Sequence, residues 1–202
     1  MYALRHRAEG HEEDQHVILN GMSWQDFEAL LAIRGDRAGV RMYYLDGSIE
    51  IMSPTKIHES RKKTLARLLE LWALELDLPL NGFGSWTLKN EMKEAGAEPD
   101  ECYILGKNTE KDVPDLAIEV EWSRATGLVK REIYARLGVR ELWTLKKNER
   151  FVLRVLERGK YAERTSSALF PKLDLTWLLS FLEIEPQSRA VRALRDELRR
   201  KR

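Results

Sequence analysis

Acidic residues placed inside an apolar strand are the first feature of this sequence that could do chemistry. Residues 116–122 are rich in Leu, Ile and Val and follow a Pro-Asp turn signal, which predicts a buried central strand. Side chains alternate between the two faces of a strand, so Glu119 and Glu121 share one face. Carboxylates are rarely buried unless they are paired or bind a metal ion. With Lys130, which follows in the chain, these acids form the residue set of a metal-dependent phosphodiesterase.

Strand geometry selects among the acids of this region. Neighbours on one face lie about 6.6 Å apart at Cα, so Glu119 and Glu121 could reach a common Mg²⁺, whose oxygen ligands lie about 2.1 Å away. Asp115 lies roughly 13 Å from Glu119, too far to share that ion, and is expected at a turn or strand start. A second ligand must come from elsewhere. Asp100 is the natural choice, because residues 98–105 predict a neighbouring strand.

The order and spacing of several short motifs resemble one known family. In chain order these motifs are Leu45-Asp46-Gly47, Met52-Ser53-Pro54 with His58, Pro99-Asp100, the strand Asp115 to Val120, and the run Tyr134 to Trp143. Over about residues 22–184 the chain is similar to the Uma family of restriction endonucleases, within the PD-(D/E)XK nuclease superfamily. No single motif is specific, but their order and spacing together are.

The resemblance implies roles for individual residues. Asp100 and Glu119 would bind a divalent metal, and Lys130 would be the superfamily's lysine, moved onto the following helix because Glu121 occupies its usual position. The implied cofactor is Mg²⁺, with Mn²⁺ as a substitute, acting as a Lewis acid and lowering the pKa of a bound water. Lys130 would stabilise charge on the phosphate, and His58 would contact phosphate or relay a proton.

The sequence also departs from the family pattern. Tyr43 stands where the family usually carries an acid before its hairpin turn, so the resemblance implies either a weakened metal site or one that uses Glu121 or Glu50 instead. Two functions therefore stay open. The first is a Mg²⁺-dependent endonuclease that hydrolyses phosphodiester bonds of DNA. The alternative is a catalytically weak or inactive nuclease-fold module that binds nucleic acid or protein; a hydrolase of small phosphoesters is a more distant third.

Composition limits the classes of protein that fit. The chain has 202 residues, 43% of them hydrophobic, which is enough for one sizeable core. Its single cysteine, Cys102, excludes an intrachain disulfide framework. No apolar run is long enough to span a bilayer, and the start lacks the apolar centre of a signal peptide, so no membrane contact and a cytoplasmic location are expected. No fingerprint of a nucleotide or organic cofactor is present.

The small net charge of the chain implies that any binding to DNA depends on local basic segments. A net charge of +1 argues against a protein that coats nucleic acid through bulk positive charge. The candidate basic segments are Lys56 with residues 61–63, Lys130-Arg131, and the tail from Arg195 to Arg202. Each would bind phosphates in a salt-dependent way. Taken alone, each segment is more often a solvated helix face.

Patterning along the chain predicts the architecture. Residues 1–21 are polar and expected to form an irregular arm, 22–185 a nuclease-like domain, and 186–202 a basic helical tail that packs on a partner chain or stays solvated. Helices are expected from Ser23, over 58–76 and over 128–137, with a hairpin about Asp46-Gly47. Strands interspersed with helices predict an α/β domain with a mixed sheet. The resemblance implies a restriction-endonuclease-like mixed central sheet flanked by helices, and a homodimer.

Overall fold

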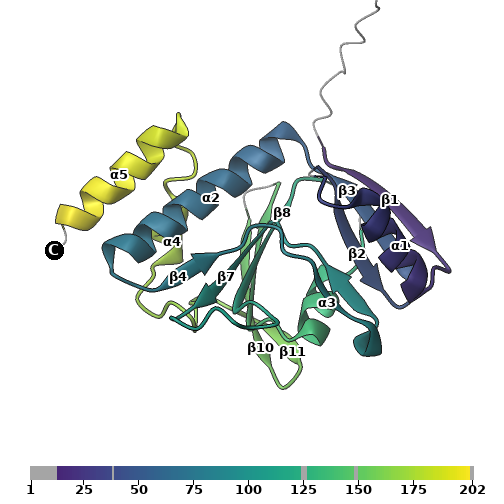
Figure 1. Ribbon diagram of the computed structural model, residues 1–202. Helices are drawn as coiled ribbons and strands as arrows, with labels where there is room; N and C mark the ends of the chain where they lie inside the picture. The colour runs from purple at the N-terminus through teal and green to yellow at the C-terminus, as the bar shows by residue number, and fades with distance from the viewer. Residues whose placement is uncertain (1–12, 38, 124–126, 148–149, 201–202) are drawn as a thin grey trace, which may run out of the picture.

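The fold was analysed in a computed structural model that describes residues 13–37, 39–123, 127–147 and 150–200 (Figure 1). The α-helices are α1 (Trp24–Arg34), α2 (Lys56–Glu75), α3 (Lys130–Leu137), α4 (Leu175–Leu179) and α5 (Gln187–Arg200). The strands are β1 (Gln15–Asn20), β2 (Arg41–Leu45), β3 (Ser48–Ser53), β4 (Leu80–Gly82), β5 (Leu88–Asn90), β6 (Ala95–Ala97), β7 (Glu101–Leu105), β8 (Leu116–Glu121), β9 (Glu141–Lys146), β10 (Phe151–Glu157) and β11 (Lys160–Arg164). In these ranges every helix is too short or too polar to cross a bilayer.

The strands divide over two sheets. One has five strands in the order β1-β3-β2-β6-β5, all paired antiparallel. The other has six strands in the order β11-β10-β9-β8-β7-β4, in which β8 and β9 run parallel and the remaining pairs antiparallel. The predicted α/β class with a mixed sheet is therefore confirmed, and the mixed sheet is the one that carries the apolar strand β8.

The predicted hairpin forms between β2 and β3. Asp46 and Gly47 have φ angles of 44° and 77°, the left-handed conformation at both central positions that a two-residue hairpin turn requires. The turn fixes the register, in which Tyr43 of β2 lies opposite Glu50 of β3. Both side chains are fully buried. A polar pair is thus held inside the five-stranded sheet, on the side where the candidate site lies.

Strand β8 separates two parts of the core, as its alternation predicts. Ile118, Val120 and Trp122 join the larger cluster, which includes buried leucines of α2. Ala117, on the other face, belongs to a second cluster with residues of β2 and α3. Glu119 shares the face of Ala117 and is fully buried. Its carboxylate therefore lies between β8 and the elements that cover that face.

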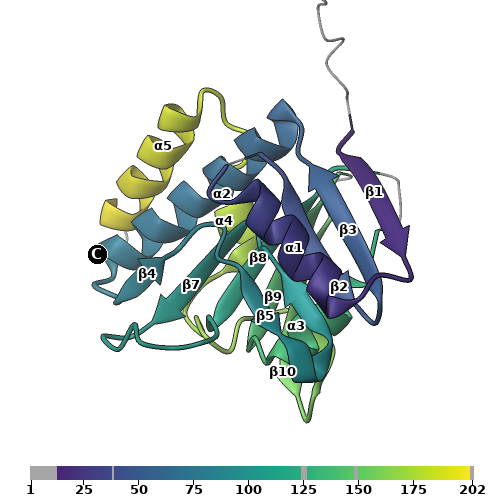
Figure 2. The ribbon, with the colours of Figure 1, turned by 45° about the vertical axis from the view of Figure 1, so that its right-hand side comes forward.

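The C-terminal helix belongs to the domain. Figures 1 and 2 show α5 alongside α2, and Ala190, Leu194 and Leu198 are buried in the larger core cluster. The tail expected at 186–202 is helical as predicted, but its apolar stripe packs on the chain's own α2 instead of a partner or solvent.

The expected irregular N-terminal arm is only partly within the described residues. Residues 1–12 lie outside them, whereas Gln15–Asn20 form the strand β1, which corrects the expectation for that part. β1 pairs antiparallel with β3 at the outer edge of its sheet, and Val17 and Ile18 are 55% and 41% exposed. An edge strand of this kind lacks the regular burial pattern from which a strand is recognised in a sequence.

Glu141, the first residue of β9, anchors the segment that follows β11. Its fully buried carboxylate accepts hydrogen bonds from Trp143 Nε1 at 2.9 Å and Ser167 Oγ at 2.8 Å. It also accepts from the backbone N–H groups of Ala168 at 2.6 Å and Leu169 at 2.9 Å. One side chain therefore satisfies four donors in the interior, beside the strand that pairs with β8.

Replacing this anchor should destabilise the whole domain. Glu141→Ala leaves buried donors without an acceptor, so we expect the free energy of unfolding to fall by roughly 3 kcal/mol. Urea denaturation followed by circular dichroism measures the loss. Glu157→Ala is the matched control, because Glu157 pairs with Arg164 on the exposed surface, and it should change stability by less than about 0.5 kcal/mol. Equal losses for both variants would contradict the assignment.

Candidate active site

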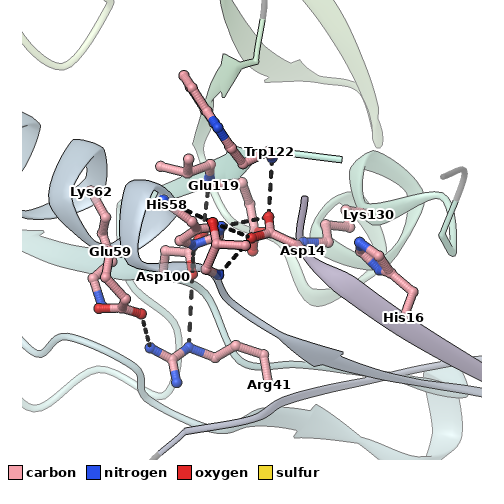
Figure 3. A network of polar contacts seen from close by, with 12 residues as sticks. Asp14, His16, Arg41, His58, Glu59, Lys62, Asp100, Glu119, Trp122 and Lys130 are labelled. Atoms are coloured by element: carbon pink, nitrogen blue, oxygen red, sulfur yellow. Dashed lines mark hydrogen bonds and ion pairs between the residues drawn. The ribbon is translucent and has the colours of Figure 1, made fainter. Parts of the chain in front are cut away.

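The structure brings four of the predicted site residues together (Figure 3). Glu119 lies on β8, Asp100 immediately precedes β7, Lys130 is the first residue of α3, and His58 lies in the first turn of α2. Asp100, Glu119 and His58 are at most 1% exposed, and the Lys130 side chain is 10% exposed. Four segments far apart in the sequence thus place charged groups in one buried cluster.

Glu119 is the centre of the cluster. Its Oε2 lies 2.5 Å from Lys130 Nζ and accepts a hydrogen bond from the Tyr43 hydroxyl at 3.1 Å, while Oε1 accepts one from Tyr134. Burial raises the pKa of Glu119 to about 7, against the lowering effect of the Lys130 ammonium, and the charge of Asp100 adds to the rise. The Glu119 carboxylate is therefore held in place by three side chains, and the Lys130 ammonium balances its negative charge.

Lys130 carries a permanent positive charge in this cluster. Burial alone would lower its pKa, but the Glu119 carboxylate and other nearby acidic groups outweigh burial and hold the pKa well above its usual value. Nζ donates to the Tyr43 hydroxyl at 3.0 Å and lies 4.2 Å from the centre of the Tyr43 ring. Tyr43, which stands where the family pattern has an acid, thus holds both partners of the Lys130–Glu119 pair.

Asp100 ends a chain of three alternating charges. Its Oδ2 accepts a hydrogen bond from the Val120 backbone N–H at 2.8 Å, and its Oδ1 lies 2.9 Å from His58 Nε2. His58 Nδ1 lies 2.8 Å from Asp14 Oδ2. Burial would lower the pKa of His58, but the two carboxylates outweigh it and raise the pKa to about 9. His58 is therefore an imidazolium at neutral pH, and its charge keeps Asp100 ionised.

The predicted role of His58 in contacting phosphate or relaying a proton is not what this geometry supports. The ring is fully buried, and both nitrogens face carboxylates. His58 instead lies behind Asp100 and is placed to orient it. This is the arrangement by which a second layer of side chains fixes the ligands of a metal site.

Asp14 was not identified from the sequence. Its carboxylate accepts hydrogen bonds from the backbone of Thr55 at 2.8 Å and of Trp122 at 3.1 Å, in addition to its ion pair with His58. It therefore ties together the start of β1, the N-terminus of α2 and the end of β8. Asp14 lies in a polar run without periodicity, so no pattern in the sequence marks it as buried.

Two further predicted acids are engaged elsewhere. Glu121, expected to be a metal ligand, lies directly opposite Lys146 in the parallel β8–β9 pair, and their charged groups are 3.1 Å apart. Glu50 is fully buried, with Oε1 2.6 Å from His16 Nδ1 and Oε2 accepting from the Leu128 backbone N–H at 2.6 Å. The parallel register places Lys146 beside Glu121, which explains why the Glu121 carboxylate forms an ion pair there. Both carboxylate oxygens of Glu50 have partners.

The acids that remain fit a hard divalent cation. Asp100 Oδ1 is buried and is held 2.9 Å from His58 Nε2, and Glu119 supplies a second carboxylate in the same cluster. In the described part of the chain no three His, Cys, Asp or Glu side chains form a ready ligand set. Mg²⁺ does not require one, because it is commonly bound by one or two carboxylates with water and substrate phosphates. Asp100 and Glu119 are therefore the residues that could hold it.

A cavity of about 880 Å³ adjoins the cluster and is lined by Lys130, His16 and Glu50. Its other side carries four cationic side chains, which we call the basic wall: Arg131, Lys146, Lys147 and Arg154. Of the three predicted basic segments, Lys130-Arg131 is the one among the described residues that lines this cavity. The remaining members of the wall are Lys146 at the end of β9, Lys147 directly after it, and Arg154 on β10, and the pairing of the two strands brings them to the same cavity.

The charge of His58 gives the protein a defined dependence of stability on pH. A pKa raised from 6.5 to about 9 means that the stabilisation is complete below pH 6.5 and is lost as the pH rises through 9. In EDTA, the free energy of unfolding should fall across that range by up to roughly 3 kcal/mol. His58→Gln should remove this slope. Lys89→Met, which breaks an exposed pair with Glu28, should keep it, and an unchanged slope in His58→Gln would contradict the assignment.

Known proteins connect this site to a family. The chain matches the family model described as "Uma2: Putative restriction endonuclease" over residues 24–193. Among solved structures it is similar to a crystal structure described as a "putative nuclease belonging to DUF820" from Anabaena variabilis ATCC 29413, at 13% identity and a TM-score of 0.43, covering 78% of this chain and 90% of that one. No curated protein matches. The family model spans most of the chain, from α1 into α5, and the resemblance seen in the motifs is confirmed: this chain belongs to the Uma2 family, described as "Putative restriction endonuclease".

Proposed function

We propose that this protein is a Mg²⁺-dependent endonuclease that hydrolyses phosphodiester bonds of DNA, with Mn²⁺ as a substitute metal. The observation that carries the proposal is the position of the Lys130 ammonium, 2.5 Å from the buried carboxylate of Glu119 and in the same cluster as Asp100. Metal-dependent hydrolysis of a phosphodiester requires carboxylates that can bind a divalent ion, together with a cationic side chain that stabilises charge on the phosphate. Asp100 and Glu119 are the two carboxylates, and Lys130 is the cation.

Each residue has a separate part in this mechanism. Asp100 and Glu119 would hold the ion, which when bound supplies a Lewis acid for the phosphate and lowers the pKa of a water. Lys130 stabilises the negative charge that develops on the phosphate oxygens. Tyr43 and Tyr134 hold the oxygens of Glu119 by hydrogen bonds, and so fix where the carboxylate points.

The basic wall supplies the contact with the substrate's backbone. Its cations line the same cavity as Lys130, so a nucleic acid strand bound there would have its phosphates beside the acids. Arg131 is exposed, and no described residue pairs with it. The other members of the wall pair with acids, Lys146 with Glu121, Lys147 with Glu13 and Arg154 with Glu163, so phosphates bound there would compete with these carboxylates for the cations.

Cleavage assays with substitutions that preserve shape test the proposal. With Mg²⁺ or Mn²⁺, the wild type should nick supercoiled plasmid or cut single-stranded DNA, and EDTA should abolish the activity. Asp100→Asn, Glu119→Gln and Lys130→Met should each lower the rate by at least about 10²-fold, the usual effect of losing one electrostatic contact to the transition state. Lys89→Met, whose exposed pair with Glu28 lies outside the cluster, should cleave at the wild-type rate.

The same assay distinguishes the nuclease from the alternative, a module that binds nucleic acid without cutting it. Tyr43 in place of an acid and the pairing of Glu121 with Lys146 favour a module that binds without cutting. DNA binding by anisotropy, with no cleavage of any substrate under either metal, would establish that alternative and reject the nuclease. RNA of the same sequence, assayed in parallel, tests the preference for DNA.

Metal titration separates binding from chemistry. In isothermal calorimetry at pH 8.5, above the pKa of about 7 of Glu119, the wild type should bind Mn²⁺. Asp100→Asn and Glu119→Gln should weaken binding at least about 10-fold. Lys130→Met should bind at least as tightly as the wild type, because the ammonium no longer competes for Glu119 Oε2. Weaker binding by Lys130→Met would mean that the lysine is needed to hold the acids together.

A further inference from the structure

His16 is a buried histidine with one unused nitrogen. Its Nδ1 lies 2.6 Å from Glu50 Oε1, and the side chain is only 13% exposed. Its Nε2 is buried and has no hydrogen-bond partner among the described residues. Buried polar atoms are nearly always paired, so an unpaired imidazole nitrogen points to a ligand or a role in catalysis.

Glu50 determines which nitrogen of His16 carries the proton. Burial alone would raise the pKa of Glu50, but its contact with His16 and the charge of Lys130 outweigh burial and lower it. Glu50 is therefore an ionised carboxylate at neutral pH and can only accept hydrogen bonds. In the neutral imidazole the hydrogen therefore lies on Nδ1, facing Glu50, and Nε2 keeps a free electron pair.

The pocket for Glu50 is built to hold this pair. Its second oxygen accepts from the backbone of Leu128, and a Cβ atom at Gly127 would overlap the carboxylate. A glycine is therefore required where the chain passes Glu50. These contacts fix the carboxylate, and with it the imidazole, as supporting residues do for a catalytic group.

His16 shares the cavity of about 880 Å³ with Lys130, and Figure 3 shows the two side chains on the same side of the site. The charged groups around it come from several elements. The acids are Asp14 before β1, Glu50 on β3 and Glu121 on β8, and the cations are Lys130 and the basic wall. This space is large enough for a phosphate with its attacking water beside the imidazole.

Other candidates for a proton acceptor in this site are already engaged. Lys130 Nζ contacts the Glu119 carboxylate and the Tyr43 hydroxyl, and both nitrogens of His58 face carboxylates, so neither side chain is free to bind a water. Asp100 and Glu119 are the proposed metal ligands. Among the described residues that line the cavity, His16 is the remaining group with a free electron pair on a titratable nitrogen.

We propose that His16, oriented by Glu50, is the general base of the phosphodiester hydrolysis, an inference that rests on the proposed function. Nε2 takes a proton from the attacking water as the new bond from that oxygen to phosphorus forms. The bond from phosphorus to the leaving sugar oxygen breaks, and that oxygen takes a proton from solvent. The products are a phosphomonoester and an alcohol, and the proton on Nε2 returns to solvent.

The dependence of the cleavage rate on pH is the direct test. Under single-turnover conditions with saturating Mg²⁺, the wild-type cleavage rate should fall at acidic pH, because a protonated general base cannot accept a proton. His16→Gln should lower the rate by roughly 10²- to 10⁴-fold, the usual contribution of a general base, and should lose the part of this acidic limb that the Glu119 carboxyl group does not cause. Lys89→Met should keep both the rate and the limb. Added imidazole should restore part of the rate to His16→Gly, since the small base can enter the vacated space.

A measurement without metal or cleavage tests the arrangement itself. In ¹⁵N NMR of the wild type in EDTA, His16 should show a protonated Nδ1 and a bare Nε2, and Glu50→Gln should disturb that tautomer. A proton on Nε2 of the neutral ring in the wild type would overturn the inference, as would an acidic limb of the same position and depth in His16→Gln as in the wild type.

The outcomes separate this inference from the proposed function. If the wild type cleaves and His16→Gln loses rate equally at every pH, His16 is a structural residue and only the inference fails. If the wild type cleaves no substrate under any metal, the proposed function fails and the inference fails with it. Loss of the acidic limb together with rescue by imidazole supports both.

Discussion

The carboxylate of Glu119 has no exposure to solvent and lies in the middle of the mixed sheet, a position that a free carboxylate could not hold without a large cost in free energy. It is held there by the ammonium of Lys130, 2.5 Å away, and by hydroxyls from Tyr43 and Tyr134. α3 must therefore begin where it does, and β2 must present a tyrosine at this point. The geometry of the whole site depends on this pair of charges.

A second chain of charges joins the parts of the fold around that pair. Asp14, His58 and Asp100 alternate in sign and connect the start of β1, the first turn of α2 and the entrance to β7. The backbone of β8 donates to Asp100, and the end of that strand donates to Asp14. One set of contacts thus positions a candidate metal ligand and joins the start of β1 and the ends of two strands of the six-stranded sheet to α2.

Local patterns in the sequence predicted the elements whose burial is regular. The alternation in β8 predicted both of its faces, and Asp46-Gly47 predicted the hairpin, because each depends on neighbouring residues alone. The positions of Asp100, Glu119 and Lys130 followed from the resemblance to the family. Asp14 and His16 could not be found in this way, since they lie on or beside an edge strand and become buried only through contacts with Glu50 and His58.

The central claim is that Asp100 and Glu119 form a divalent metal site from which Lys130 can be displaced toward the phosphate. Anomalous diffraction from a crystal soaked in Mn²⁺ tests it most directly, because the signal locates the ion without any assumption about activity. The account predicts one peak bounded by the Asp100 and Glu119 carboxylates, with Lys130 Nζ farther from Glu119 than the present 2.5 Å. A Lys130–Glu119 pair unchanged at saturating Mn²⁺, with no peak between the acids, would contradict it.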